Sequence, residues 1–243
     1  MAQFNDVLVT LSTRGNLHLL NKPTIALVGA RNASINAIRH AETLARELGE
    51  AGYVIMSRMA RGIDAAAHRS AMATGTIGVI ASGNDIIYPP KNCAQFQEIV
   101  DEGLLSAEML PEIAPIPRHF TTRNRIIASL ALEAVVIEAA AKLGSLVTAL
   151  EAGERGSEVM AIPRSPLDPR SNGCNQLIRD GAKLVQNATD IIEAVGQHCS
   201  VEAPLKKQYR SKCHKQLLPT QKFQNAARSS FQRLAANRLM LTI

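Results

Sequence analysis

Short apolar runs alternate with stretches of helical spacing between residues 24 and 199. The run TIALVGA at 24–30 is continuously apolar and ends in small residues, which is typical of a strand buried on both faces of a parallel sheet. Further strands are predicted by similar runs at 53–57, 76–82, 134–139, 158–163 and 183–185.

Helical patterns fill the intervals between these runs. Ser34 is a suitable N-cap for a helix in which apolar residues recur every three or four positions as far as Leu48. Other helices are predicted at 63–73, 92–101, 124–132, 145–155 and after a Thr189 cap. Repeated strand–helix units predict an α/β fold in which helices cover both faces of a mainly parallel sheet.

Right-handed crossovers place the carboxyl ends of parallel strands at one edge of the sheet, where ligands of such folds bind. The expected edge consists of segments 29–34, 57–64, 82–85, 138–148 and 163–165. They combine small residues with helix starts, and they include arginines at 31, 58, 61 and 164. Backbone amides and guanidinium groups in such places favour a phosphate ligand. The sequence contains neither GxGxxG nor GxxxxGK[ST], so the pattern of NAD or ATP sites is absent.

Other polar residues in these segments suggest structural roles. Asp64 and His68 are four residues apart on one predicted helix, as expected of a local polar pair. Glu138 ends a strand and is either a base or an anchor for Arg123 or Arg125. We find no nucleophile arrangement and no metal-ligand spacing, so we expect no catalytic residue, metal or cofactor, and we expect His119 to lie on the surface.

Composition and charge change this picture only for the C-terminal segment. The chain has 243 residues, 46% of them hydrophobic and only 3% aromatic, so Ala, Ile, Leu and Val must build the core. The net charge of +6 comes from residues 200–243, which contain nine Lys and Arg residues but a single acidic one, Glu202. The four cysteines form no CxxC, which favours reduced thiols. No apolar run is long enough for a membrane span, and the N-terminus lacks the layout of a signal peptide.

Three segments are therefore expected. Residues 1–23 form an N-terminal lead-in, residues 24–199 form the α/β domain, and residues 200–243 form a basic and flexible tail. The tail either is simply solvated or adds a non-specific attraction for nucleic acid that fades as salt increases.

Several stretches together resemble the DNA processing protein A (DprA/Smf) family. They are IALVGARNAS (25–34), ARGIDAAAHRSAM (60–72), TIGVIASGNDIIYPPKN (76–92), LLSAEMLP (104–111), FTTRNRIIASL (120–130), VVIEAAAKLGSLVTA (135–149) and PRSPLDPRSNGCNQLIRDGAKLV (163–185). Their order and spacing agree with the family across residues 14–196, which makes the combined pattern specific.

The resemblance implies an extended Rossmann-like, doubly wound domain that binds single-stranded DNA and is not an enzyme. Such proteins are cytoplasmic, form homodimers, protect incoming DNA and load the RecA recombinase onto it during natural transformation. The positions that we expect to bind DNA are Gly29, Arg31, Arg61, Gly62, Gly83, Lys91, Phe120, Arg123, Gly144, Ser145 and Thr148. The polar positions that we expect to be structural are Asp64, His68, Arg125 and Glu138. Phe120 would stack on a base, Arg125 would pair with Glu138 or Glu108, and Arg123 would lie further out and touch phosphate.

The chain also departs from the family pattern. Arg58, Ser129, Leu143 and Arg164 stand at or beside places where the family usually has glycine, so the two arginines either strengthen phosphate binding or block the pocket. The family's N-terminal helical domain and C-terminal winged helix are not recognisable. Two alternatives stay open. One is a nucleotide-processing N-glycosidase, for which residues 142–148 and Glu151 would replace a Pro-Gly-Gly-x-Gly-Thr motif, and the other is a degenerate remnant that binds nothing.

Overall fold

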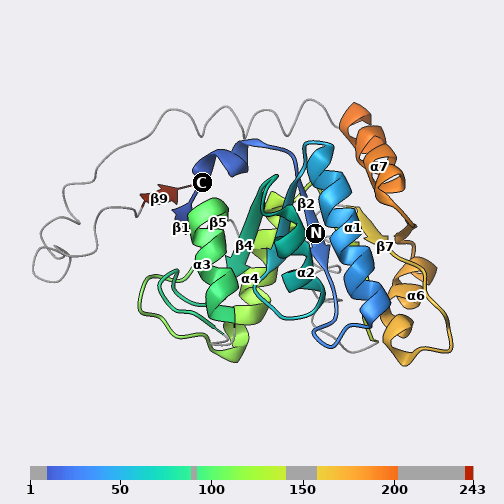
Figure 1. The fold of residues 1–243 in the computed structure, drawn as a ribbon, viewed down its shortest axis with the longest axis horizontal. Coiled ribbons are helices and arrows are strands. Elements are labelled where there is room, and N and C mark those ends of the chain that lie inside the picture. Colours follow the sequence, from blue (N-terminus) through green and yellow to red (C-terminus); the bar gives the residue numbers. More distant parts are fainter. Residues whose placement is uncertain (1–9, 89–91, 141–157, 202–238, 243) are drawn as a thin grey trace, which may run out of the picture.

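A nine-stranded sheet organises the protein, as seen in a computed structural model that describes residues 10–88, 92–140, 158–201 and 239–242 (Figure 1). The strand order is β8-β7-β6-β2-β3-β4-β5-β1-β9. All pairings from β2 to β8 are parallel, whereas β1 runs antiparallel to both β5 and β9. The predicted α/β fold with a mainly parallel sheet is therefore confirmed.

The strands are β1 (Thr10–Gly15), β2 (Thr24–Val28), β3 (Val54–Arg58), β4 (Thr76–Ile80), β5 (Leu104–Ala107), β6 (Glu133–Val136), β7 (Val159–Ala161), β8 (Lys183–Leu184) and β9 (Leu239–Thr242). The helices are α1 (Ile35–Glu50), α2 (Ile63–Ala71), α3 (Cys93–Glu102), α4 (Pro117–Leu130), α6 (Asn172–Arg179) and α7 (Ala188–Val201), with 3₁₀ turns η1 (Leu17–Asn21) and η3 (Pro169–Ser171).

Alternation along the central strands divides the core into two layers. Ile25 and Leu27 of β2 belong to the same buried cluster as residues of α1, α2 and α7. Ala26 of β2 and Met56 of β3 lie in a second cluster with Ile126 and other residues of α4. Since successive side chains of a strand point to opposite faces, helices cover both faces of the sheet. Continuous burial of β2, β3 and β4 explains why apolar residues dominate their sequences without a regular alternation with polar ones.

The order of the strands reverses between β2 and β6. The chain builds β2, β3, β4 and β5 in one direction, then returns through α4 to place β6 on the other side of β2. Their carboxyl ends lie together at the lower edge of the molecule in Figure 1. A reversal of this kind separates the loops that follow the two strands, which makes this edge the expected place for a ligand.

Several predictions from the sequence need correction. β1 and β5 were not predicted as strands, because TLSTRG is largely polar and β5 is only four residues long. The helix expected at 124–132 begins seven residues earlier, since Pro117 occupies the first helical turn and suits it. Thr189 does not cap α7, because the amide of Asp190 donates instead to Oδ1 of Asn187, at 2.9 Å.

The sheet also reaches beyond residues 24–199. β1 lies in the expected lead-in, and its residue Thr13 is in register with Ser106 of β5. β9 lies in the expected tail, where its backbone pairs with β1. The division into three segments stays a prediction, and most of residues 200–243, like the helix expected at 145–155, lie outside the described residues. Among the described helices, none is long and apolar enough to cross a membrane.

Candidate nucleic-acid interface

Two loops pack against each other at the centre of the carboxyl edge. The β2–α1 loop follows Val28, and the β3–α2 loop follows Arg58. Gly62 has a φ of +81°, and a Cβ at this residue would collide with the backbone of Ala30 and Arg31. Gly62 is therefore required both by its backbone conformation and by the close approach of the two loops.

Arg31 and Arg61 are the exposed cations that this packing brings to the edge. Arg31 lies on the β2–α1 loop, and Arg61 immediately precedes Gly62 on the β3–α2 loop. Neither guanidinium has an ion-pair or hydrogen-bond partner within the described part of the chain. Two exposed arginines on adjoining loops, without acidic neighbours to neutralise them, suit the binding of an anion.

Gly29 and Gly83 have a structural explanation that needs no ligand. A Cβ at Gly29 would collide with the side chain of Ile63, and one at Gly83 would collide with the carbonyl oxygen of Leu110. The amide of Gly83 also donates to the carbonyl of Ile113, at 2.9 Å. The space freed by each glycine is thus filled by the protein itself, and a contact of these residues with DNA stays a prediction.

Arg58 is turned into the protein, below the two loops. Its Nε and Nη2 donate to the carboxylate of Asp64 at 2.8 and 3.0 Å, and Nη2 also donates to the carbonyl of Gly29 at 2.7 Å. Arg58 is 7% exposed and Asp64 is fully buried. An arginine thus replaces the glycine of the family pattern without reaching the surface of the edge.

His68 does not pair with Asp64, which corrects one expectation. Its Nδ1 lies 2.7 Å from Oγ1 of Thr76, and its Nε2 lies 3.0 Å from the carbonyl oxygen of Arg58. Burial lowers the pKa of His68, an effect partly opposed by the hydrogen bond to that carbonyl and by the charge of Asp64. The imidazole is therefore neutral and fixes the position of β3 relative to α2.

Glu138 is fully buried beyond the carboxyl end of β6, and its partners differ from those expected. It accepts hydrogen bonds from the amide and hydroxyl of Ser34, at 2.8 and 2.6 Å. Its third partner is Arg164, whose Nη1 lies 3.6 Å from Oε2. Glu138 thus joins the start of α1 to the loop after β7, whereas Arg125 forms its ion pair with Glu108.

The early start of α4 changes the position of its arginines. Arg123 and Arg125 lie in the middle of the helix and are 7% and 8% exposed, so the expectation that Arg123 lies further out is wrong. Nη1 of Arg123 donates to the carbonyl of Val79 at 2.8 Å, and Arg125 forms an ion pair with Glu108. His119, expected on the surface, is also buried, at 8% exposure. Contact of Arg123 with a phosphate remains only a prediction, and its burial speaks against it.

Phe120 lies on the first turns of α4, and it has an aromatic neighbour that the sequence did not reveal. The ring centroids of Phe120 and Tyr88 are 5.9 Å apart, and the planes are inclined by 55°. Phe120 is partly buried, whereas Tyr88 is 50% exposed. Tyr88 follows β4 and Phe120 follows the β5–α4 loop, so the pair lies at the carboxyl edge that Arg31 and Arg61 also occupy.

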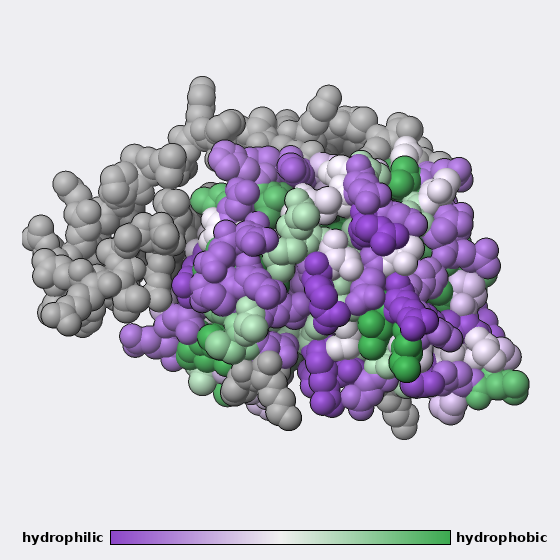
Figure 2. Space-filling view, viewed as in Figure 1, coloured by the Kyte–Doolittle hydropathy of each residue, from purple (hydrophilic) through white to green (hydrophobic). Residues whose placement is uncertain are grey.

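Hydrophobic side chains interrupt the hydrophilic surface along the same edge (Figure 2). Among the residues that the structure describes, seven large hydrophobic side chains are exposed. Six of them come from segments between the carboxyl end of a strand and the next helix or its first residue: Ile35, Tyr88, Leu110, Ile113, Ile116 and Leu167. An edge that combines exposed cations with exposed apolar side chains suits a ligand that carries both phosphates and bases.

Four of the expected DNA-binding positions lie outside the described residues. They are Lys91, Gly144, Ser145 and Thr148, and the stretch that was compared with an N-glycosidase motif lies there too. Within the described residues, no group of three His, Cys, Asp or Glu side chains could hold a metal ion. Cys174 is buried, and burial raises the pKa of its thiol to about 11.

Known proteins share this sequence pattern and architecture. Residues 1–196 match the family model described as DNA recombination-mediator protein A. The chain is 41% identical over 194 residues to DNA processing protein DprA of Streptococcus pneumoniae, a match that covers 79% of the chain and 68% of that protein. It therefore spans about two thirds of the length of this relative.

Solved structures agree with the sequence match. The X-ray structure of the Streptococcus pneumoniae protein superposes with a TM-score of 0.72 and 41% identity, covering 75% of this chain and 65% of the other. DNA processing protein A of Helicobacter pylori, studied for its mode of binding single-stranded DNA, gives 0.72 at 31% identity, with 77% and 87% covered. On the family match and these similarities, the chain belongs to the DNA recombination-mediator protein A (DprA/Smf) family.

Proposed function

We propose that this protein binds single-stranded DNA at the carboxyl edge of its sheet. The observation that carries the proposal is the pair of exposed guanidinium groups, Arg31 and Arg61, on two loops that Gly62 allows to pack together. The relative from Helicobacter pylori, which binds single-stranded DNA, supports the choice of ligand. Phosphates of the strand would contact the arginines, and a base would stack on the ring pair of Phe120 and Tyr88. Such binding is largely independent of sequence and weakens as salt rises.

A salt titration of oligo-dT binding tests the proposal. Arg31→Ala should weaken binding and make the dependence of log K on log salt shallower by about 0.7 for each phosphate contact that is lost. Arg46→Ala is the matched control, because Arg46 is an exposed arginine near the opposite end of α1 and carries the same charge. Equal effects of the two substitutions would show that only net charge matters and would overturn the assignment to the edge.

The basic tail is the competing explanation for binding. A variant in which Lys206, Lys207, Arg210 and Lys212 are all replaced by Gln removes four charges while it leaves the edge intact. We expect this variant to lose affinity only at low salt, since salt screens long-range electrostatic attraction. If it abolishes binding and Arg31→Ala does not, the tail is the binding site.

We also propose that binding occurs without turnover. Glu138, the buried carboxylate nearest to the start of α1, is already engaged by Ser34 and Arg164. The imidazole of His68 is buried with both nitrogens engaged. Incubation with nucleoside monophosphates should therefore release no free base, as followed by chromatography. Release of free base would instead favour the N-glycosidase alternative.

The wider role follows from the family. We propose that the protein acts in the cytoplasm as a homodimer that protects incoming single strands and loads RecA onto them during natural transformation. Sedimentation equilibrium tests the dimer, and RecA filament assembly on protein-coated oligonucleotides tests the loading. A folded protein that binds no oligonucleotide at low salt would instead support the degenerate-remnant alternative.

A further inference from the structure

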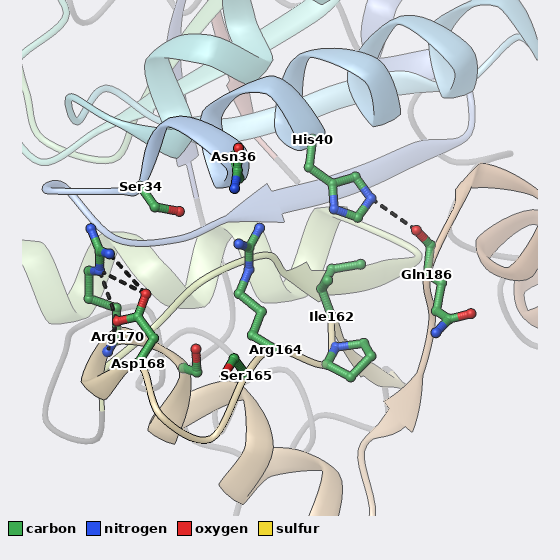
Figure 3. A pocket seen from close by; sticks show the side chains of 11 residues that line it. Ser34, Asn36, His40, Ile162, Arg164, Ser165, Asp168, Arg170 and Gln186 are labelled. Carbon is green, nitrogen blue, oxygen red and sulfur yellow. Dashed lines mark hydrogen bonds and ion pairs between the residues drawn. The ribbon is translucent and has the colours of Figure 1, made fainter.

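An open cavity of about 490 Å³ lies beside the start of α1, between the loop after β7 and the 3₁₀ turn η3 (Figure 3). We call it the Arg164 pocket. The part of its wall that matters chemically consists of Ser34, His40, Arg164, Ser165, Arg170 and Ser171. It is lined neither by Arg31 nor by the Phe120 ring, so it is distinct from the strand-binding positions proposed above.

Arg164 places a guanidinium group in the middle of this pocket. Figure 3 shows the side chain extending from the loop after β7 toward Asn36 at the start of α1. Its Nε donates to the carbonyl of Ile137 at 3.1 Å, and Nη1 lies 3.6 Å from Glu138, which is too long for a direct hydrogen bond. Since a guanidinium has five N–H donors, the terminal nitrogens of Arg164 retain donor capacity toward a ligand.

Arg170 adds a second guanidinium at the rim. It is held by the carboxylate of Asp168, through hydrogen bonds of 2.8 to 3.2 Å, and its side chain is 48% exposed. An exposed ion pair contributes little net free energy, so Arg170 can exchange Asp168 for an anionic ligand at small cost. The N-terminal end of α1 faces the same space and contributes its positive dipole.

Ser171 provides an independent indication of a ligand. Its side chain is 1% exposed and lines the pocket, yet its Oγ has no hydrogen-bond partner among the described residues. Buried hydroxyl groups in native proteins almost always have a hydrogen-bond partner, so a hydroxyl without one needs an explanation. A ligand that reaches the wall formed by η3 supplies the missing partner.

The size of the pocket and its remaining walls restrict the class of ligand that it can bind. A volume of about 490 Å³ exceeds the needs of inorganic phosphate and falls in the range of small-molecule sites. Ile162 and Pro163 form an apolar wall, whereas the side chain of Asn36 brings an amide group that can hydrogen-bond to the edge of a base. We propose that the Arg164 pocket binds one nucleotide unit, with its phosphate between Arg164 and Arg170 and with a hydrogen bond to Ser171.

The nucleotide unit has two possible sources that share this chemistry. It is either a free mononucleotide or one nucleotide of the bound strand; the second case rests on the strand binding proposed above. Arg164 is one of the positions at which this sequence departs from the family pattern.

The test is calorimetric titration of the full chain with dTMP and with inorganic phosphate, together with oligo-dT binding. If the ligand is a free mononucleotide, dTMP binds and phosphate binds more weakly. Ser171→Ala and Arg170→Gln then each lower the dTMP affinity about tenfold. If the ligand is one nucleotide of the bound strand, dTMP fails to bind, but the same two substitutions lower oligo-dT affinity about tenfold. Arg69→Gln is the control, since Arg69 forms a comparable exposed ion pair with Glu42 away from the pocket, and it should change neither affinity.

The proposal is overturned if dTMP does not bind and Ser171→Ala and Arg170→Gln leave oligo-dT affinity unchanged. It is also overturned if dTMP binds equally well to wild type and to both variants. Circular dichroism of each variant verifies that it is folded. These results are independent of Arg31→Ala, which tests the strand-binding edge alone, so failure of one proposal can be told from failure of the other.

Discussion

Arg58 donates hydrogen bonds of 2.8 and 3.0 Å to the carboxylate of Asp64, and both side chains are buried directly below the loop that presents Arg31. Asp64 Oδ1 also accepts from the amide of Gly29, at 3.3 Å. The pair therefore connects the carboxyl ends of β2 and β3 to the start of α2. The geometry answers the question raised by the family's missing glycine: the arginine neither adds a surface charge nor fills the edge, but neutralises a buried acid.

Arg58→Gly, which restores the usual residue of the family, should destabilise this protein. It leaves the carboxylate of Asp64 buried without its cation, a change that typically costs about 3 kcal/mol or more. Urea denaturation followed by circular dichroism measures the loss. A second comparison replaces each arginine by alanine, as Arg58→Ala and Arg69→Ala. Alanine is used because Arg69 lies in α2, where glycine would itself destabilise the helix. The exposed pair of Arg69 with Glu42 should contribute less than about 1 kcal/mol. Similar losses in the two alanine variants would contradict the structural role of Arg58.

Arg123→Gln and Arg125→Gln should both lower stability, by about 2 kcal/mol each, rather than divide into one structural and one binding variant. Arg123 loses a buried hydrogen bond to Val79, and Arg125 leaves Glu108 without its ion pair. Thermal unfolding measures the loss, and oligo-dT binding well below the melting temperature checks affinity. An Arg123→Gln protein with unchanged stability and much weaker DNA binding would mean that Arg123 turns outward when DNA is present.

The central strands could be predicted from the sequence, since β2, β3 and β4 are buried on both faces and are therefore mostly apolar. β1 could not, because its six residues, TLSTRG, are largely polar and show no alternation that would predict a strand. The helix predicted at 124–132 includes Ile126 and Ile127, which α4 packs into the core, but the first turns of α4 carry few apolar residues and only Pro117 marks its start.

The site was predictable as a set of loops, but not as a set of contacts. The sequence predicted that Arg31 and Arg61 lie on edge loops, because each is next to a glycine or a small residue between a strand and the start of a helix. The partner of each carboxylate depends on which distant parts of the chain the fold brings together. Glu138, for example, accepts a hydrogen bond from Ser34, which is 104 residues away in the sequence. Ser171 and Tyr88 gave no signal because a lone serine or tyrosine in a polar segment is ordinary, and only burial or a neighbouring ring distinguishes it.

Phe120→Ala should weaken oligo-dT binding by about 1 to 3 kcal/mol if a base stacks on this ring. Tyr88→Ala should have a smaller effect in the same direction, because the Tyr88 ring lies 5.9 Å from Phe120 and supports its orientation. Tyr88→Phe keeps the ring and should bind like the wild type. Fluorescence anisotropy with labelled oligo-dT and with an abasic oligonucleotide measures the effects. The losses should disappear with the abasic strand, and losses that persist would point to a structural role for the rings.

Acid should destabilise the protein through His68 before the carboxylates titrate. Burial lowers the pKa of His68 in the folded state, whereas the unfolded chain titrates near the ordinary value of about 6.5. Below that pH the unfolded state binds the additional proton, so the free energy of unfolding falls as pH falls, by at most about 1.4 kcal/mol per pH unit. Denaturation at pH 7.5 and 5.5 measures this loss. His68→Asn should be less stable at both pH values but should show less change between them, whereas His18→Asn, at an exposed histidine, should retain the wild-type difference. An unchanged pH dependence in His68→Asn would assign the acid sensitivity to other groups.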